Sequence, residues 1–271
     1  MLFLLTGDVQ IGKTRWLERL AEELAGEGAA VAGVLAPGVW RERKPHEAAG
    51  KRGLSGEGRF EKLGIHAVLL PQGDRIPFAL RRDLALAEGS FDPASQSAAA
   101  HLGWEISDEA IARINAHFDR IAAEEAPPAK KAADPAALEP RQAGSEKPAP
   151  DRADPMSGMF HVKHPFVQTS VPCTGSGAEE GGAGFACSAG GLLVVDELGR
   201  LELVRGAGLT SAVALLDAGP TRRFPHALAV VRAGLCGLAE ARFSTVWGGT
   251  RALAPDDAAR AVVRAACGLS A

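Results

Sequence analysis

The stretch Gly7-Asp8-Val9-Gln10-Ile11-Gly12-Lys13-Thr14 decides the fold that we predict for this chain. Its glycines, lysine and threonine have the G-x-x-x-x-G-K-T spacing of a phosphate-binding loop. The glycines let the backbone curl so that successive N–H groups point at an anion. Lys13 would then reach the outer phosphates of a nucleoside triphosphate, and the Thr14 hydroxyl would ligate Mg²⁺. We therefore predict that every residue of this loop binds the nucleotide.

The segments beside the loop favour this interpretation. Residues 2–6 open with an apolar run shorter than the roughly 7–15 residues of a signal-peptide core, so we predict a buried strand. Residues 13–25 have apolar side chains at helical spacing, and residues 29–35 form a second apolar run. A strand, a helix and a strand in this order favour a parallel sheet. The alternative is a plain strand-turn-helix unit with a surface lysine.

A second motif carries candidate chemistry far along the chain. Residues 191–195 predict a buried strand, and Asp196-Glu197 follow its apolar run. An aspartate in this position holds Mg²⁺ in phosphate-binding-loop enzymes, and a neighbouring glutamate orients and deprotonates the attacking water. We predict Lys13 and Glu197 as catalytic residues, and Thr14 and Asp196 as the Mg²⁺ site. The alternative is that both acids are solvated residues at a strand end.

Other periodic segments extend the predicted α/β fold. Apolar runs over 65–70 and 76–80 flank Pro71-Gln72-Gly73-Asp74, which favours an antiparallel hairpin. Ser107 is a candidate N-cap for a helix over 107–123. The remaining predicted elements are helices over 208–218 and 256–267 and strands over 226–231 and 243–247.

The composition changes sharply between the two motifs. Residues 124–190 are rich in Pro, Ala, Gly and charge, which is typical of a disordered insertion. We predict one domain built from residues 1–123 and 191–271. Within the insertion, residues 159–164 can be encoded by the palindrome ATGTTTCACGTGAAACAT, which resembles a bacterial chromosome-partition site, so the DNA itself is one explanation for this hexapeptide. The alternative is that His161 and His164 ligate a metal, although no third ligand lies at suitable spacing.

The composition and charge of the chain argue against several classes of function. A net charge of -3 and 5% aromatic residues without tyrosine argue against nucleic acid as a partner. No apolar stretch approaches the roughly 20 residues of a membrane span, which argues against a membrane partner. The 4 cysteines form no C-x-x-C pair. We predict reduced thiols in a cytoplasmic protein.

The motifs occur in the order found in a known family. Residues 6–14, Gly33-Val34-Leu35-Ala36-Pro37-Gly38-Val39 and residues 194–203 together resemble the nucleoside-triphosphatase family typified by the cancer-related and thermophile enzymes. The run Asp196-Glu197-Leu198-Gly199-Arg200-Leu201-Glu202-Leu203 is the most specific part. The resemblance implies a RecA-like, mostly parallel sheet flanked by helices and Mg²⁺-dependent hydrolysis of ATP, GTP or other triphosphates. It carries over the phosphate, metal and catalytic roles given above, whereas we assign Glu202 a structural contact.

The chain also departs from the family. A Gly-Thr pair usually ends the strand after the acidic one, and here the matching residues are Val230-Val231-Arg232. Arg232 either replaces the missing threonine as a charge-stabilising group or is a surface residue past a strand end. The basic segment 41–52 either covers the nucleotide, touches a polynucleotide or is a solvated loop. Trp40 and Trp104 either stack on a base or pack within the protein. His46, His66 and His117 have no visible partners.

Two rival functions use the same phosphate-binding loop. A nucleotide or small-molecule kinase needs an acceptor pocket and usually an arginine-rich lid, which the basic segment 41–52 could supply. A nucleotide-gated adaptor would bind nucleotide tightly, turn it over slowly and change its partner with nucleotide state. The adjacent acids Asp196 and Glu197 favour water as the acceptor, so we predict hydrolysis first.

Overall fold

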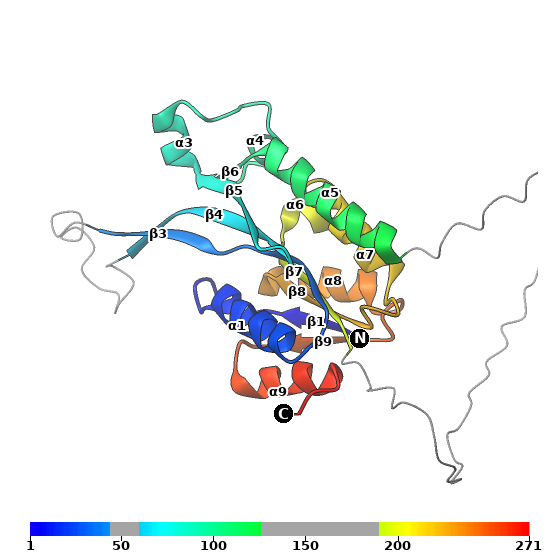
Figure 1. The fold of residues 1–271 in the computed structure, drawn as a ribbon. Helices are drawn as coiled ribbons and strands as arrows, with labels where there is room; N and C mark the ends of the chain where they lie inside the picture. Colours follow the sequence, from blue (N-terminus) through cyan, green and yellow to red (C-terminus); the bar gives the residue numbers. More distant parts are fainter. Residues whose placement is uncertain (44–59, 126–189, 271) are drawn as a thin grey trace, which may run out of the picture. The chain divides into compact units, whose positions relative to one another are not determined.

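The computed structural model describes residues 1–43, 60–125 and 190–270. These residues form a 9-stranded sheet with helices on both faces (Figure 1). The order across the sheet is β6-β5-β4-β2-β7-β8-β1-β9, and β3 pairs with β4. The strands are β1 (Leu2–Leu5), β2 (Val31–Leu35), β3 (Gly38–Glu42), β4 (Phe60–Leu70), β5 (Asp74–Arg81), β6 (Trp104–Ile106), β7 (Leu192–Leu198), β8 (His226–Val231) and β9 (Thr250–Leu253).

The central part of the sheet is parallel. β2, β7, β8, β1 and β9 all run in one direction, and β8 separates β7 from β1. β7 lies far along the chain from β2, yet the two strands are neighbours, with Gly33 paired to Val194. Segments before residue 126 and after residue 189 therefore build one sheet. The predicted mixed α/β fold with parallel strands and flanking helices is confirmed.

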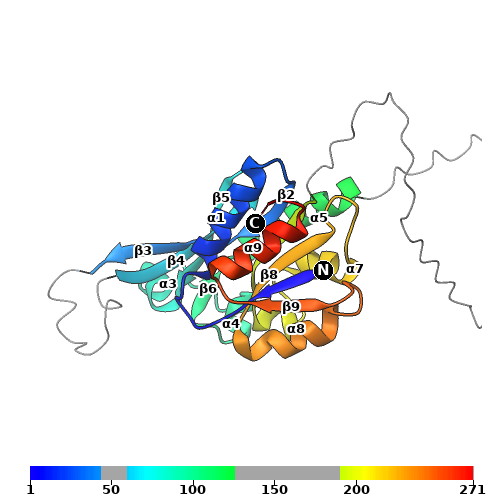
Figure 2. The ribbon, with the colours of Figure 1, turned by 90° about the horizontal axis from the view of Figure 1, so that it is seen from below.

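The helices form a layer on each face of the sheet. α1 (Lys13–Gly26) and α9 (Asp257–Ala266) lie together on one face (Figure 2), and the other face carries α5 (Asp108–Glu125), α7 (Thr210–Ala218) and α8 (Cys236–Phe243). The shorter elements are α3 (Arg82–Glu88), α4 (Gln96–Ala99), α6 (Arg200–Leu203) and the 3-10 turn η1 (Ala233–Leu235). None of the helices in the described ranges has the length and apolar character needed to cross a bilayer.

Alternation along β1 produces two cores. Phe3 and Leu5 pack with α1 and α9, while Leu2 and Leu4 pack with α5 and α7. Successive side chains of a strand point to opposite faces, so a strand covered on both faces is apolar throughout. This explains why every residue of β1 is buried.

The predicted strand over 243–247 is wrong. Phe243 ends α8, the following residues form a turn, and the last strand is β9. Phe243 and Trp247 are both buried, and the N–H of Trp247 donates to the carbonyl of Phe243, which is a helical spacing. The apolar character of these residues predicts a strand, but their spacing is that of a helix. β9 has no apolar signal in the sequence, because the middle residues of that strand are exposed at the sheet edge.

The antiparallel part of the sheet is larger than predicted. The hairpin of β4 and β5 is confirmed, but β4 begins at Phe60 and also pairs with β3. Of the residues of β4, those from Val68 to Leu70 pair with β2. Because β4 is antiparallel to β2, its first half continues beyond the carboxyl end of β2. The predicted insertion, with residues 159–164, lies outside the described residues, except that Glu124 and Glu125 complete α5 and residue 190 precedes β7.

His117 has hydrogen-bond partners in the structure, so the prediction that it has none is wrong. Its side chain on α5 is buried, and its Nε2 lies 3.1 Å from both the carbonyl oxygen of Gly33 and that of Leu70. Carbonyl oxygens only accept, so Nε2 carries a hydrogen and donates to both. Gly33 and Leu70 face each other across β2 and β4. His117 therefore ties α5 to the junction between the parallel and antiparallel strands.

Gly33 occupies a backbone position that excludes side chains. Its φ is 121°, and a Cβ there would stand 1.9 Å from the carbonyl oxygen of Val194 on β7. We expect Gly33→Ala to lower the free energy of unfolding by about 3 kcal/mol or more, because both strain and a backbone clash arise. Denaturant unfolding measures the change. Gly26→Ala is the matched control, because Gly26 ends α1 with open space around it. Equal stability of the two variants would contradict the expectation.

Burial lowers the pKa of His117, so the folded protein favours its neutral form. As the pH falls through about 6.5 the unfolded chain takes up a proton first, and the stability that neutral His117 contributes is lost. We expect His117→Leu to be less stable than wild type by about 1–2 kcal/mol at pH 7.5, because leucine has no hydrogen-bond donor and leaves the two carbonyls without their shared partner. The difference should shrink at pH 5.5. Denaturant unfolding of both proteins at the two pH values tests this, and a difference independent of pH would count against it.

Candidate functional site

The loop between β1 and α1 has the backbone of an anion cradle. Gly7, Gln10 and Gly12 have positive φ values of 136°, 68° and 91°. Alternation between left-handed and right-handed residues turns successive N–H groups toward the same side. A Cβ on Gly7 would stand 2.5 Å from Cδ1 of Ile11, which favours glycine there. Gly12 caps α1 without a side-chain oxygen, which leaves the first N–H groups of this 14-residue helix available to an anion.

Lys13 folds back across the loop. Its Nζ donates to the carbonyl oxygens of Gly7 at 2.9 Å and Asp8 at 2.7 Å. The ammonium therefore lies against the first residues of the loop, on protein acceptors that phosphate oxygens could replace. Val9 and Ile11 are exposed. The loop thus presents its lysine on the inside and its apolar side chains to solvent.

Asp196 joins three separate segments. Its carboxylate is buried near the carboxyl end of β7, and Oδ2 accepts a hydrogen bond of 2.9 Å from the N–H of Ala36, directly after β2. The Thr14 hydroxyl, at the start of α1, is close enough to this carboxylate to lower its pKa. The structure thus brings together the two residues that the sequence analysis assigned to Mg²⁺, although they lie far apart in the chain, on α1 and β7.

Burial raises the pKa of Asp196 to about 6, against the hydrogen bond from Ala36. A buried carboxylate of this kind is stabilised by a nearby cation. Within the described ranges, no cluster of three or more His, Cys, Asp and Glu side chains could hold a metal on its own. This donor set fits Mg²⁺, which proteins commonly hold with one or two side chains together with waters and the phosphates of a nucleotide.

Glu197 lies beside Asp196 but is more exposed. Its Oε1 accepts from Arg232, at 3.3 Å from Nε and 3.1 Å from Nη2. Arg232 directly follows β8, the strand next to β7. Of the two alternatives for Arg232, the structure favours a place in the site, because its guanidinium contacts the predicted catalytic glutamate.

Sequence reasoning missed Lys62, on β4. Its side chain is partly buried, and its Nζ lies 5.3 Å from the ring centroid of Trp104. Burial lowers the pKa of Lys62, whereas the negative charges of Glu197 and Asp196 raise it. The ammonium therefore belongs to the same electrostatic environment as the two acids. No local pattern around Lys62 signals this, because the contact depends on how β4 extends past β2.

Glu202 makes structural contacts of the kind that we assigned to it. It is buried near the end of α6, and its carboxylate accepts hydrogen bonds from the N–H of Gly199 at 2.8 Å and of Leu209 at 3.3 Å. Burial raises the pKa of Glu202. These two hydrogen bonds hold in place the segment that follows Glu197, which is a structural role.

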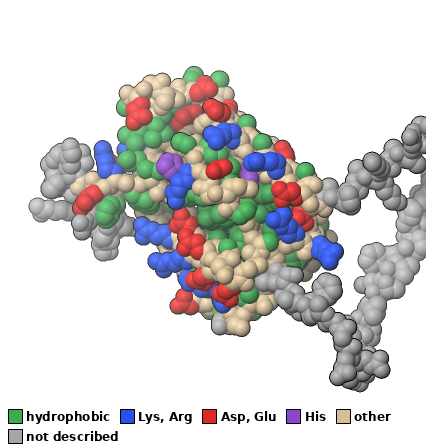
Figure 3. Space-filling model, viewed as in Figure 1, with side chains coloured by type: hydrophobic (Ala, Val, Ile, Leu, Met, Phe, Trp, Pro, Cys, Tyr) green, Lys and Arg blue, Asp and Glu red, His purple; other side chains and the backbone are tan. Residues whose placement is uncertain are grey.

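Part of the basic segment is neutralised by one acid. Glu61 pairs with Arg41, and it also lies 3.7 Å from Arg43 and 3.3 Å from Arg81. Basic and acidic side chains are interspersed over the face shown in Figure 3. Trp40 is 41% exposed on β3, and Trp104 lies beneath Lys62. His46 and most of the basic segment lie outside the described residues.

Comparisons with known proteins add little to this geometry. No protein-family model matches the chain, and no curated protein matches it. Among solved structures, the chain is similar to the solution structure of a human cancer-related nucleoside triphosphatase. The identity is 14%, the match covers 96% of this chain and 90% of that chain, and the TM-score is 0.43. Membership of the nucleoside-triphosphatase family stays a prediction that rests on the motifs.

Proposed function

We propose that the protein is a Mg²⁺-dependent nucleoside-triphosphate phosphohydrolase, which converts a triphosphate and water into a diphosphate and phosphate. The observation that carries the proposal is the closeness of the Thr14 hydroxyl to the buried carboxylate of Asp196, whose pKa it lowers. The first helical turn after the loop is therefore near the acidic strand. A phosphate cradle and a metal-binding acid then meet at one point, with Glu197 next to them.

Each part of the site has a separate task in this proposal. The N–H groups of the loop and the positive end of α1 bind the phosphates, and Lys13 leaves the carbonyls of Gly7 and Asp8 for phosphate oxygens. Thr14 and Asp196 would hold Mg²⁺. When bound, this ion neutralises charge on the phosphates as the reaction proceeds.

Glu197 is the proposed base. Its carboxylate orients a water and accepts a proton as the water oxygen bonds to the terminal phosphorus. The bond from that phosphorus to the bridging oxygen breaks, and the diphosphate leaves. In the described structure Glu197 is held by Arg232. Release of this contact frees the carboxylate for water and turns the guanidinium toward the phosphate being transferred.

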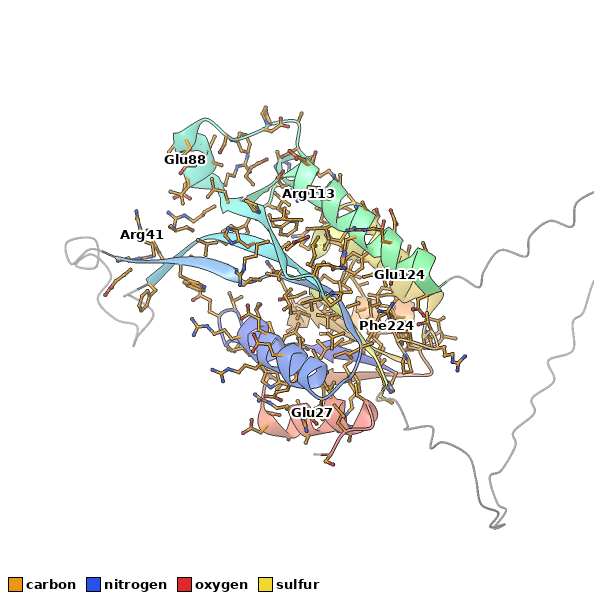
Figure 4. The ribbon with its side chains drawn as sticks, viewed as in Figure 1. Glu27, Arg41, Glu88, Arg113, Glu124 and Phe224 are labelled. Atoms are coloured by element: carbon orange, nitrogen blue, oxygen red, sulfur yellow. The ribbon has the colours of Figure 1, made fainter. Side chains whose placement is uncertain are left out.

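Phosphate release from triphosphate alone tests this reaction. We expect release by wild type with Mg²⁺ and no acceptor, a loss of about 100-fold or more in Lys13→Ala, and a comparable loss in Glu197→Gln. The reasons are the missing phosphate contact and the missing base. Glu88→Gln is the matched control, because Glu88 ends α3 on an exposed edge (Figure 4).

Other outcomes of the same assay contradict the proposal. Wild-type rates in Lys13→Ala would remove the loop from the reaction. Phosphate transfer that requires an added nucleotide or small-molecule acceptor would identify a kinase instead. Tight binding of triphosphate with negligible turnover would indicate a nucleotide-gated adaptor.

Arg232 provides a second test. Because its ion pair with Glu197 is exposed, we expect Arg232→Ala to change the free energy of unfolding by less than about 1 kcal/mol. We expect its turnover number to fall by at least about tenfold, since a positive charge beside the transferred phosphate is lost. Steady-state kinetics and denaturant unfolding measure the two effects. Arg242→Ala is the matched control, because Arg242 makes an exposed ion pair with Asp217 away from the site. Equal turnover in both variants would contradict this prediction and identify Arg232 as a surface residue without a role in the reaction.

A further inference from the structure

Lys62 is carried to the site by strand pairing. β2 ends at Leu35, whose partner on β4 is Val68, so the segment of β4 before Val68 runs on past the carboxyl end of β2. The carboxyl ends of β2 and β7 are also where Ala36 and Asp196 meet. β4 therefore extends beyond the carboxyl ends of the parallel strands, where the nucleotide would lie.

Short links connect Asp196 to the side chain of Lys62. The N–H of Ala36 donates to Asp196, and Gly38 follows only two residues later. A Cβ on Gly38 would stand 2.8 Å from Cε of Lys62 and 2.7 Å from Nε1 of Trp40. The aliphatic stem of Lys62 thus lies over Gly38, directly beyond the segment that holds the acidic strand.

The Lys62 ammonium is available to a ligand. It lies over the ring of Trp104. Among the described residues, no acidic side chain forms an ion pair with it, although Glu197 and Asp196 are close enough to raise its pKa. The neighbouring residue Glu61 lies on the other face of the strand, where it pairs with arginines. A partly buried cation without a paired acid gains from contact with a multiply charged anion.

We propose that Lys62 contacts the terminal phosphate of a bound nucleoside triphosphate, so that β4 senses the third phosphate in addition to the loop 7–14. This inference rests on the proposed function, because it assumes that the loop binds a nucleotide. Lys62, on the β4 strand of the antiparallel hairpin, would distinguish a triphosphate from a diphosphate. Lys62 moves from the ring of Trp104 to the phosphate when the triphosphate binds.

Affinities for two nucleotides test the proposal. Isothermal titration calorimetry with Mg²⁺ compares a non-hydrolysable β,γ-imido triphosphate with the matching diphosphate. We expect Lys62→Met to weaken binding of the triphosphate analogue on the order of 10- to 100-fold, while diphosphate binding changes by less than about threefold. Methionine keeps an unbranched apolar stem over Gly38 and Trp104, so packing is retained. Lys62→Arg should restore most of the affinity for the triphosphate analogue.

A control variant separates direct contact from general charge. Arg41→Gln removes a positive charge from β3, the strand paired with the first half of β4, and Figure 4 shows Arg41 toward the outer end of these strands. Arg41 pairs with Glu61, across the strand from Lys62. We expect Arg41→Gln to leave the ratio of the two affinities unchanged. A similar shift of this ratio in Arg41→Gln and Lys62→Met would overturn the proposal.

Tryptophan fluorescence gives a reading in the unmodified protein. If the ammonium leaves Trp104, the triphosphate analogue should change the emission and the diphosphate should not. The change should disappear in Trp104→Phe. Equal losses of both affinities in Lys62→Met, or no loss of either, would overturn the role of Lys62 alone. Failure of wild type to bind either nucleotide would overturn the proposed function, and this inference with it.

Discussion

The buried carboxylate of Asp196 is the constraint on which the candidate site depends. It accepts a hydrogen bond from Ala36 and lies near the Thr14 hydroxyl, so it connects the carboxyl end of β7 with the end of β2 and the start of α1. A buried ionisable group is costly unless hydrogen bonds or a cation compensate for its lost hydration. Burial raises the pKa of Asp196, and the nearby donors offset this only in part. The fold therefore holds a position that a bound cation would stabilise, at the point where the loop begins its helix.

The strand order explains why this position forms. β7 lies between β2 and β8, so the residues that follow these neighbours, Ala36 and Arg232, flank the pair Asp196 and Glu197. Carboxyl ends of parallel strands meet at one edge of a sheet, which is where ligands bind in open α/β folds. This arrangement gives the two acids different burial and different partners. Asp196 points into the protein and meets N–H and hydroxyl donors, while Glu197 stays partly exposed and meets a guanidinium.

The sequence predicted the parts of this site that have local signals. The loop 7–14 has a spacing rule, and an apolar run that ends in acids marks β7, so the meeting of Thr14 and Asp196 follows once both strands are parallel. Lys62 and His117 have no such signal. Lys62 comes near the acids because β4 extends past β2. His117, on α5, donates to carbonyl oxygens on two strands, β2 and β4. Both depend on pairings between distant segments, which periodicity alone does not specify. The strand predicted over 243–247 failed for a different reason, because its two buried aromatic residues are spaced for a helix face.

The positive charges at the candidate site each have a partner within the protein. Lys13, Lys62 and Arg232 bring three positive charges to the neighbourhood of Asp196 and Glu197. Each cation already has a substitute partner, namely the carbonyls of Gly7 and Asp8, the ring of Trp104 and the carboxylate of Glu197. Under the proposed function, binding of a polyphosphate would be an exchange of partners rather than the burial of bare charges, which limits its desolvation cost. The exchange is also selective. The carbonyls that hold Lys13 lie within the loop, whereas Arg232 and Lys62 come from β8 and β4 beyond it, so only a ligand that extends past the loop can replace all three partners.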